Sequence, residues 1–126
     1  MKNALIVFVG SGLGGVTRHL LNGFITGLAG PGFPWGILII NITGSLALGL
    51  LAELFALRMQ AAPEVRLFLT TGIIAGYTTF STFSLDTALL YERGQLGLAV
   101  VYVAASVIVS IAALFAGLWI IRWATP

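Results

Sequence analysis

Long uncharged stretches dominate the hydrophobic pattern of the chain. No charged residue occurs in 19–52, 67–85 or 94–121. Each stretch can hold a helix of about 20 residues, the length that crosses a hydrocarbon core of about 30 Å. A further apolar segment runs from about Ala4 to Leu28 and contains Arg18. The pattern therefore predicts four transmembrane helices.

Helix-breaking residues separate the predicted spans. The separators are Ala29–Pro34, with glycines and prolines, Arg58–Glu64, with Pro63, and Glu92–Gly94, with charges and a glycine. Such residues end helices or form the turns between them. No linker or second domain is expected. We therefore predict that residues 1–126 form a single all-α, four-helix membrane domain.

Composition narrows the class of function. Hydrophobic residues make up 59% of the chain and charged residues 8%, against about 25% charged in an ordinary soluble domain, so a soluble globular protein is excluded. With no cysteine, one histidine and four acidic residues, a metal cage and hydrolytic or redox chemistry are not expected, and neither is an enzyme. The scattered lysines and arginines give no footprint for nucleic acid. Transport across a lipid bilayer fits this composition.

A glycine motif in the first span invites a different interpretation. Gly10–Gly15 matches the dinucleotide-binding fingerprint G-x-G-x-x-G letter by letter. That fingerprint needs an acidic residue about 20 positions further on, and the nearest one is Glu53. We therefore interpret the glycines as a close helix contact, like the small pair Gly72 and Gly76 in the third span.

The middle of the third span, Ala75–Ser84, is rich in hydroxyl side chains. Hydroxyls can satisfy backbone groups that a helix break frees, and breaks are tolerated where they are buried or line a cavity. The stretch predicts an interruption near Ala75–Thr79, where exposed carbonyls could bind a cation. The alternative is that the hydroxyls bond back to carbonyls of an unbroken helix.

Three further side chains at membrane depth are candidates for binding. Phe80 and Phe83 are three residues apart and share one helix face, where their ring edges would favour an anion. Both rings could instead be core packing. Asn41 lies within an apolar run, and its amide is costly there unless it has a partner. It could join two helices or donate to a ligand.

Two more features concern the fourth and first spans. Tyr102, Ser106 and Ser110 recur every four residues, which places their hydroxyls along one helix face as a polar track or as small-residue packing. Arg18 is the sole formal charge well inside a span. It either attracts an anion or, as we expect, extends toward a nearby interface. Asp86 and Glu92 are expected to be solvated.

In the motifs Gly14–Arg18, Gly36–Asn41 and Thr78–Ser84, and in its length and four spans, the chain resembles the Fluc/CrcB fluoride channels. The resemblance covers nearly the whole chain. It implies a dual-topology antiparallel homodimer in the inner membrane, with two pores that export fluoride passively. It also implies a sodium ion at the dimer centre that is structural and is not transported.

The resemblance also implies roles for individual residues. The fluoride pores would be lined by the side chains of Asn41, Phe80, Ser81, Thr82, Phe83, Tyr102, Ser106 and Ser110. Backbone carbonyls of Ala75 and Thr78 from both subunits would hold the sodium, and Arg18 would stand near the pore mouth. Ile37, Leu114 and Ala75 depart from the pattern expected of the family, because the first two lack a hydroxyl and the third replaces a glycine.

Two rival functions remain open at this point. A small proton-coupled multidrug exporter also has four spans, but it would need a glutamate within the first span, where this chain has Arg18. An accessory subunit would move nothing by itself. The hydrogen-bond donors, the aromatic ring edges and the family motif together favour a fluoride channel.

Charges at the span ends give a mild bias in orientation. Lys2, Arg58, Arg66 and Arg122 fall on the side of both termini, whereas Arg93 falls on the opposite side. The positive-inside rule then favours cytoplasmic termini. Because the margin is small and an antiparallel dimer needs both orientations, we expect dual insertion on the strength of the resemblance.

Overall fold

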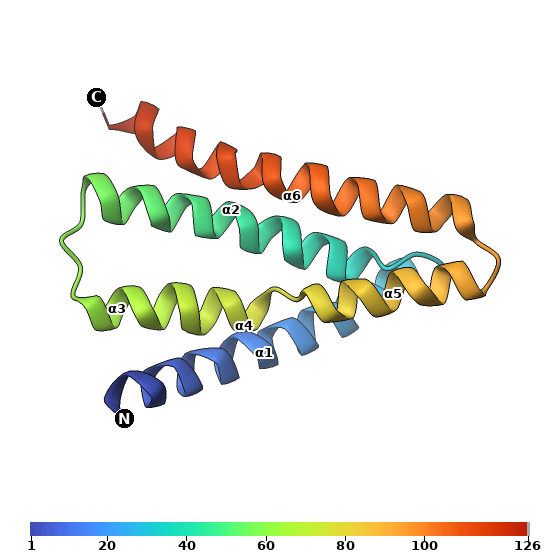
Figure 1. Ribbon diagram of the computed structural model, residues 1–126, viewed down its shortest axis with the longest axis horizontal. Helices are drawn as coiled ribbons and strands as arrows, with labels where there is room; N and C mark the ends of the chain where they lie inside the picture. The colour runs from blue at the N-terminus through green and yellow to red at the C-terminus, as the bar shows by residue number, and fades with distance from the viewer. Residues whose placement is uncertain (126) are drawn as a thin grey trace.

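The computed structural model describes residues 1–125 as a bundle of helices. The elements are α1 (Lys2–Ala29), α2 (Trp35–Leu57), α3 (Pro63–Leu67), η1 (Phe68–Ile74), α4 (Ala75–Tyr77), α5 (Phe80–Glu92) and α6 (Leu96–Ala124). α1, α2 and α6 are long and apolar enough to cross a membrane. The four elements from α3 to α5 follow one another along a single interrupted rod (Figure 1). The four predicted spans are thus three continuous helices and one composite.

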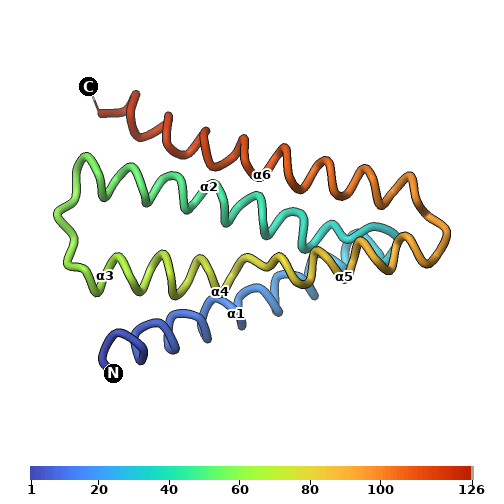
Figure 2. Tube along the Cα trace, viewed as in Figure 1, coloured from blue at the N-terminus to red at the C-terminus, as the bar shows by residue number. Residues whose placement is uncertain are grey.

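The rods run side by side and alternate in direction. Both termini and the α2–α3 connection lie at one end of the bundle, and the other two connections lie at the opposite end (Figure 2). α2 packs mainly on α6, whereas α1 packs mainly on η1 and α4. This arrangement places the interruption of the third rod near the middle of the bundle, within reach of both α1 and α2.

Turns end the helices where the sequence predicts them. Gly30 follows α1 with φ of 81°, and Gly94 follows α5 with φ of 76°. Glycine adopts this left-handed conformation without a steric penalty. Pro63 occupies the first turn of α3, where its missing N–H is not needed. The three predicted separators are therefore confirmed.

Glycines bring α1 against the third rod. A Cβ atom added to Gly10 would lie 2.8 Å from the Cα of Gly72, and one added to Gly76 would lie 2.7 Å from the Cα of Ser11. A Cβ on Gly14 would meet the backbone of Ile73 and Tyr77. The glycine motif of the first span therefore serves close helix packing, as predicted.

Ion pairs join the helices at the end that holds the termini. Lys2 Nζ lies 2.8 Å from Glu64 Oε1. Arg122 donates to both carboxylate oxygens of Glu53, at 2.5 and 3.2 Å. Arg66 Nη2 donates to the carbonyl of Phe55 at 3.3 Å near the end of α2. The first two contacts tie α1 to α3 and α2 to α6.

Candidate functional site

The third rod is interrupted at Thr78 and Thr79. Both residues are extended, with φ and ψ of −80° and 157° for Thr78 and of −154° and 123° for Thr79. The predicted interruption is confirmed at the C-terminal end of the range Ala75–Thr79, and the alternative of an unbroken helix is wrong. The segment η1, which precedes α4, is a π-helix, which the sequence pattern did not predict.

Asn41 on α2 binds the backbone of the break. Its Nδ2 donates to the carbonyl of Thr79 at 3.1 Å, and its Oδ1 accepts from the Thr79 N–H at 2.9 Å. A primary amide has two N–H donors, so one of them remains for another acceptor. Asn41 therefore joins two helices and still has donor capacity.

Arg18 on α1 binds the break from the other side. Its Nη1 donates to the carbonyl of Thr78 at 3.1 Å. The expectation that Arg18 extends toward an interface is therefore wrong. An extended residue turns its carbonyl away from the helix ladder, and the guanidinium satisfies it. The proposed place of Arg18 near a pore mouth stays a prediction.

Hydroxyl groups cap the helix that restarts after the break. Thr79 Oγ1 accepts from the backbone N–H of Thr82 at 3.2 Å, as an N-cap residue does. Thr79 Oγ1 also lies 3.2 Å from Thr82 Oγ1 and 3.3 Å from Ser81 Oγ. The hydroxyls of Ser81 and Thr82 are thus engaged with the cap.

A groove of about 510 Å³ opens beside the break, between α2, α5 and α6. It brings together five of the predicted pore residues and both predicted sodium ligands, which are Asn41, Phe80, Phe83, Ser106, Ser110, Ala75 and Thr78. Ser106 Oγ and Ser110 Oγ are buried and have no hydrogen-bond partner within the described residues. Buried hydroxyls without a partner are rare in folded proteins. The apolar wall of the groove therefore contains two buried hydroxyls that no group of the described residues binds.

An aromatic row runs from the groove into the bundle. Ring centroids are 5.4 Å apart for Phe80 and Phe83, and 5.2 Å apart for Phe83 and Tyr102. The first ring is 77% exposed, whereas Phe83 is 8% exposed and Tyr102 is fully buried. As predicted, the two phenylalanines share a face, and the row leads from an open surface to the core.

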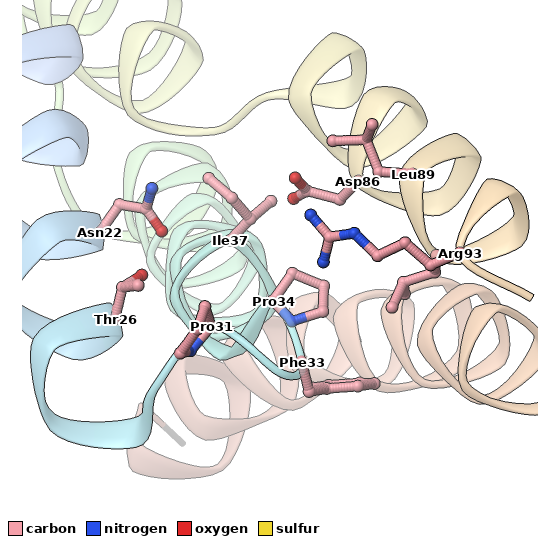
Figure 3. Close-up of a pocket in the computed structure, with 10 residues that line it drawn as sticks. Asn22, Thr26, Pro31, Phe33, Pro34, Ile37, Asp86, Leu89 and Arg93 are labelled. Carbon is pink, nitrogen blue, oxygen red and sulfur yellow. The ribbon is translucent and has the colours of Figure 1, made fainter. Parts of the chain in front are cut away.

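The Tyr102 hydroxyl binds a residue that lines a second, smaller pocket. Its hydroxyl donates to Asp86 Oδ2 at 3.1 Å, and Asp86 lines a pocket of about 170 Å³ together with Asn22, Ile37 and Arg93. In Figure 3 the Asp86 carboxylate and the Arg93 guanidinium point into this space toward one another. Glu92 is exposed, as expected, whereas Asp86 is half-buried in this pocket and bound to Tyr102, so it is only partly solvated. Its position three residues after Phe83, on the same helix face, is the signal that could have revealed it.

The predicted pore residues thus divide into two groups. Ser81, Thr82 and Tyr102 do not line the groove. The hydroxyls of Ser81 and Thr82 bond to the cap residue Thr79, and the Tyr102 hydroxyl donates to Asp86. Residues 1–125 hold no group of three His, Cys, Asp or Glu that could form a metal site. Any cation at the break would therefore bind backbone or hydroxyl oxygens.

Known proteins resemble this chain over nearly its full length. Residues 5–118 match the family described as CrcB-like protein, Camphor Resistance (CrcB). The chain is 54% identical over 118 residues to the fluoride-specific ion channel FluC of Agrobacterium fabrum, which covers 94% of each chain. It is 51% identical over 123 residues to FluC 2 of Nitrobacter hamburgensis, covering 98% of this chain and 99% of the relative. For FluC of Rhodopseudomonas palustris the identity is 54% over 118 residues, with 94% and 95% covered.

Proposed function

The chain belongs to the CrcB family, and from that premise we propose that it is a fluoride-selective channel through which fluoride leaves the cell passively across the inner membrane. The observation that carries the proposal is the groove. Its lining combines the amide of Asn41, the unpartnered hydroxyls of Ser106 and Ser110, and the Phe80 and Phe83 rings.

The chemistry of the groove suits a small, strongly hydrated anion. Fluoride gives up water only where other donors replace it, and narrow pores select ions by their width and lining donors. The two serine hydroxyls and the second N–H of Asn41 are such donors. Aromatic ring edges carry positive charge density. These groups together replace part of the hydration shell, and the apolar wall excludes bulk water.

Charge distribution argues against the rival exporter. No carboxylate lines the groove within the described residues. Glu53 is bound to Arg122 at the bundle end, and Asp86 lies in the second pocket. A proton-coupled exporter of cationic drugs needs an acid where its substrate binds, so we favour passive anion conduction.

The groove supports the proposal of an antiparallel homodimer. It is open on one side in a single copy, and the exposed Phe80 ring lies on its rim. Val107 and Ile111 add apolar surface to the same wall. A second copy laid across this face would close the groove and bring two breaks together at the centre. Two grooves per dimer then form the two proposed pores.

The residues at the break fit a structural sodium ion. In an unbroken helix the Ala75 carbonyl would accept from the Thr79 N–H, but that N–H binds Asn41 instead. The Thr78 carbonyl accepts one bond from Arg18, and a carbonyl oxygen has two lone pairs. Ala75 and Thr78 both line the groove. We propose that these carbonyls hold sodium, which would supply positive charge between the two copies.

Fluoride efflux from proteoliposomes tests the proposed function. Liposomes loaded with fluoride, with potassium and an ionophore to balance charge, are read with a fluoride electrode. We expect efflux well above that of protein-free liposomes and chloride efflux close to that of protein-free liposomes. Fluoride efflux at the protein-free rate would contradict the proposal and favour an accessory subunit. Chloride efflux at a comparable rate would contradict selectivity.

A further inference from the structure

Side chains from other helices bind three consecutive residues, Tyr77 at the end of α4 and Thr78 and Thr79 of the break. The Tyr77 hydroxyl lies 2.9 Å from Thr43 Oγ1 of α2. Arg18 of α1 binds the Thr78 carbonyl, and Asn41 of α2 binds the Thr79 backbone. Two of these contacts are neutral and come from α2. The contact of Arg18 is the charged one, and it comes from the opposite side.

The Thr78 carbonyl depends on Arg18 for a partner. In a continuous helix this oxygen would accept from the backbone N–H of Thr82, but that N–H binds Thr79 Oγ1. The ψ of 157° at Thr78 turns the carbonyl away from the helix ladder. Within residues 1–125, the guanidinium is the one donor that binds it.

The packing of α1 delivers the guanidinium to this place. Gly14 precedes Arg18 by four residues and therefore lies on the same helix face. A Cβ at Gly14 would lie 2.8 Å from the backbone nitrogen of Tyr77, so the missing side chain lets α1 approach the end of α4. One turn later, Arg18 reaches Thr78.

The charged guanidinium of Arg18 lies well inside a predicted span and needs a compensating contact there. Charged side chains inside membranes are costly, and a long arginine can usually reach an interface instead. Arg18 makes no ion pair within the described residues. The one hydrogen bond of its side chain within those residues is the bond to the Thr78 carbonyl. Hydrogen bonds from charged donors are about twice as strong as neutral ones.

From these contacts we infer that Arg18 is a positioning residue that fixes the direction of the Thr78 carbonyl and so sets the geometry of the break. The bond occupies one lone pair of the carbonyl oxygen and leaves the other free to accept. The inference rests on the proposed function only for its consequence, because the fixed carbonyl is one of the proposed sodium ligands. The conformation itself can be tested without any transport assay.

Isotope-edited infrared spectroscopy reads this carbonyl directly. A ¹³C=¹⁸O label at Thr78 is compared in detergent between the wild type and the Arg18→Gln, Arg18→Lys and Arg58→Gln variants. Arg58 is an exposed residue at the end of α2 and serves as the matched control. We expect the Thr78 stretch to move to higher frequency in Arg18→Gln, to move less in Arg18→Lys, which keeps the charge, and not to move in Arg58→Gln.

Amide hydrogen exchange gives a second readout on the same samples. We expect the Thr79 N–H to exchange about tenfold faster or more in Arg18→Gln, because loss of a charged hydrogen bond loosens the break. If Arg18→Gln does not fold, the intermediate shift in Arg18→Lys decides the question alone. An unchanged Thr78 stretch in a folded Arg18 variant overturns the inference. An unchanged stretch together with normal fluoride efflux from the wild type would leave the channel proposal intact. A shifted stretch together with no efflux from the wild type would support the inference and contradict the channel proposal.

Discussion

The break and the groove are neighbouring polar regions, and they differ in whether the protein itself binds their polar atoms. At the break, the Thr78 carbonyl accepts from Arg18, the Thr78 N–H donates to the Ile74 carbonyl, and both backbone groups of Thr79 pair with Asn41. In the groove, the hydroxyls of Ser106 and Ser110 have no partner within the described residues. A satisfied polar network rigidifies a structure, whereas a free donor is available to a ligand. On the proposed function, the break is the rigid frame and the groove is the surface that would contact the ion.

Asn41 belongs to both regions, so its replacement should have the largest effect. In Asn41→Leu both bonds to Thr79 are lost, and the N–H and C=O of that residue are left unpaired. We expect a loss of about 3 kcal/mol or more in the free energy of unfolding, measured by denaturant titration in detergent, together with loss of fluoride efflux. Asn3→Leu, the same change at an exposed position, is the control. A stable Asn41→Leu protein that conducts fluoride would contradict this division between the break and the groove.

Sodium tests whether the break also joins two copies. If carbonyls of Ala75 and Thr78 bind sodium in the dimer, the ion stabilises the assembly by about 2.7 kcal/mol at a concentration 100 times its dissociation constant. We expect the lifetime of the dimer in detergent to fall steeply when a large organic cation replaces sodium, as read by subunit exchange. Assembly and efflux that do not depend on sodium would remove the ion from the account.

Phe83 sharpens the boundary between groove and core. Phe83→Ile keeps an apolar side chain of similar size, so the cost in unfolding free energy should stay below about 1.5 kcal/mol. Loss of the ring edge should lower fluoride efflux about tenfold, which corresponds to about 1.4 kcal/mol. Crosslinking verifies that the dimer persists. Unchanged efflux in an assembled variant would assign Phe83 to packing alone.

Replacement of Thr79 should have the smallest effect, and it should lower stability rather than efflux. Thr79→Ala removes the N-cap of α5 and should cost about 1 kcal/mol of stability, whereas Thr79→Ser keeps the capping oxygen and should cost less. We expect efflux per folded protein to change little in either variant. A loss of efflux in Thr79→Ala without a loss of stability would move this hydroxyl from the frame to the ion path.

The sequence located the break but not the contacts that hold it. Hydroxyl density between Ala75 and Ser84 indicates freed backbone groups, because an unbroken helix facing lipid has no use for them. The amide of Asn41 demands a partner, yet nothing in the local pattern says that the partner is Thr79, which lies 38 residues away. Long-range pairing of this kind depends on how α1 and α2 pack. The same is true of Arg18, whose expected extension toward an interface the fold overrides.

Periodicity located the groove only in part. The four-residue spacing correctly places Ser106 and Ser110 on one wall. Tyr102 continues the same spacing, but its longer side chain carries the hydroxyl past Phe83 to Asp86. The π-helix η1 had no sequence signal that we recognised. Gly72 of η1 packs against Gly10 of α1, so the π-helix lies at the close contact between the first and third rods.

Removal of the free hydroxyls tests the central claim most directly. Fluoride efflux is measured for the double variant Ser106→Ala/Ser110→Ala and for Ser84→Ala, whose serine hydroxyl already donates to the Phe80 carbonyl at 3.0 Å. The account predicts that the double variant conducts at least about tenfold more slowly with no loss of stability, while Ser84→Ala conducts like the wild type. Efflux from the double variant at the wild-type rate would contradict the claim that the groove donors carry the ion.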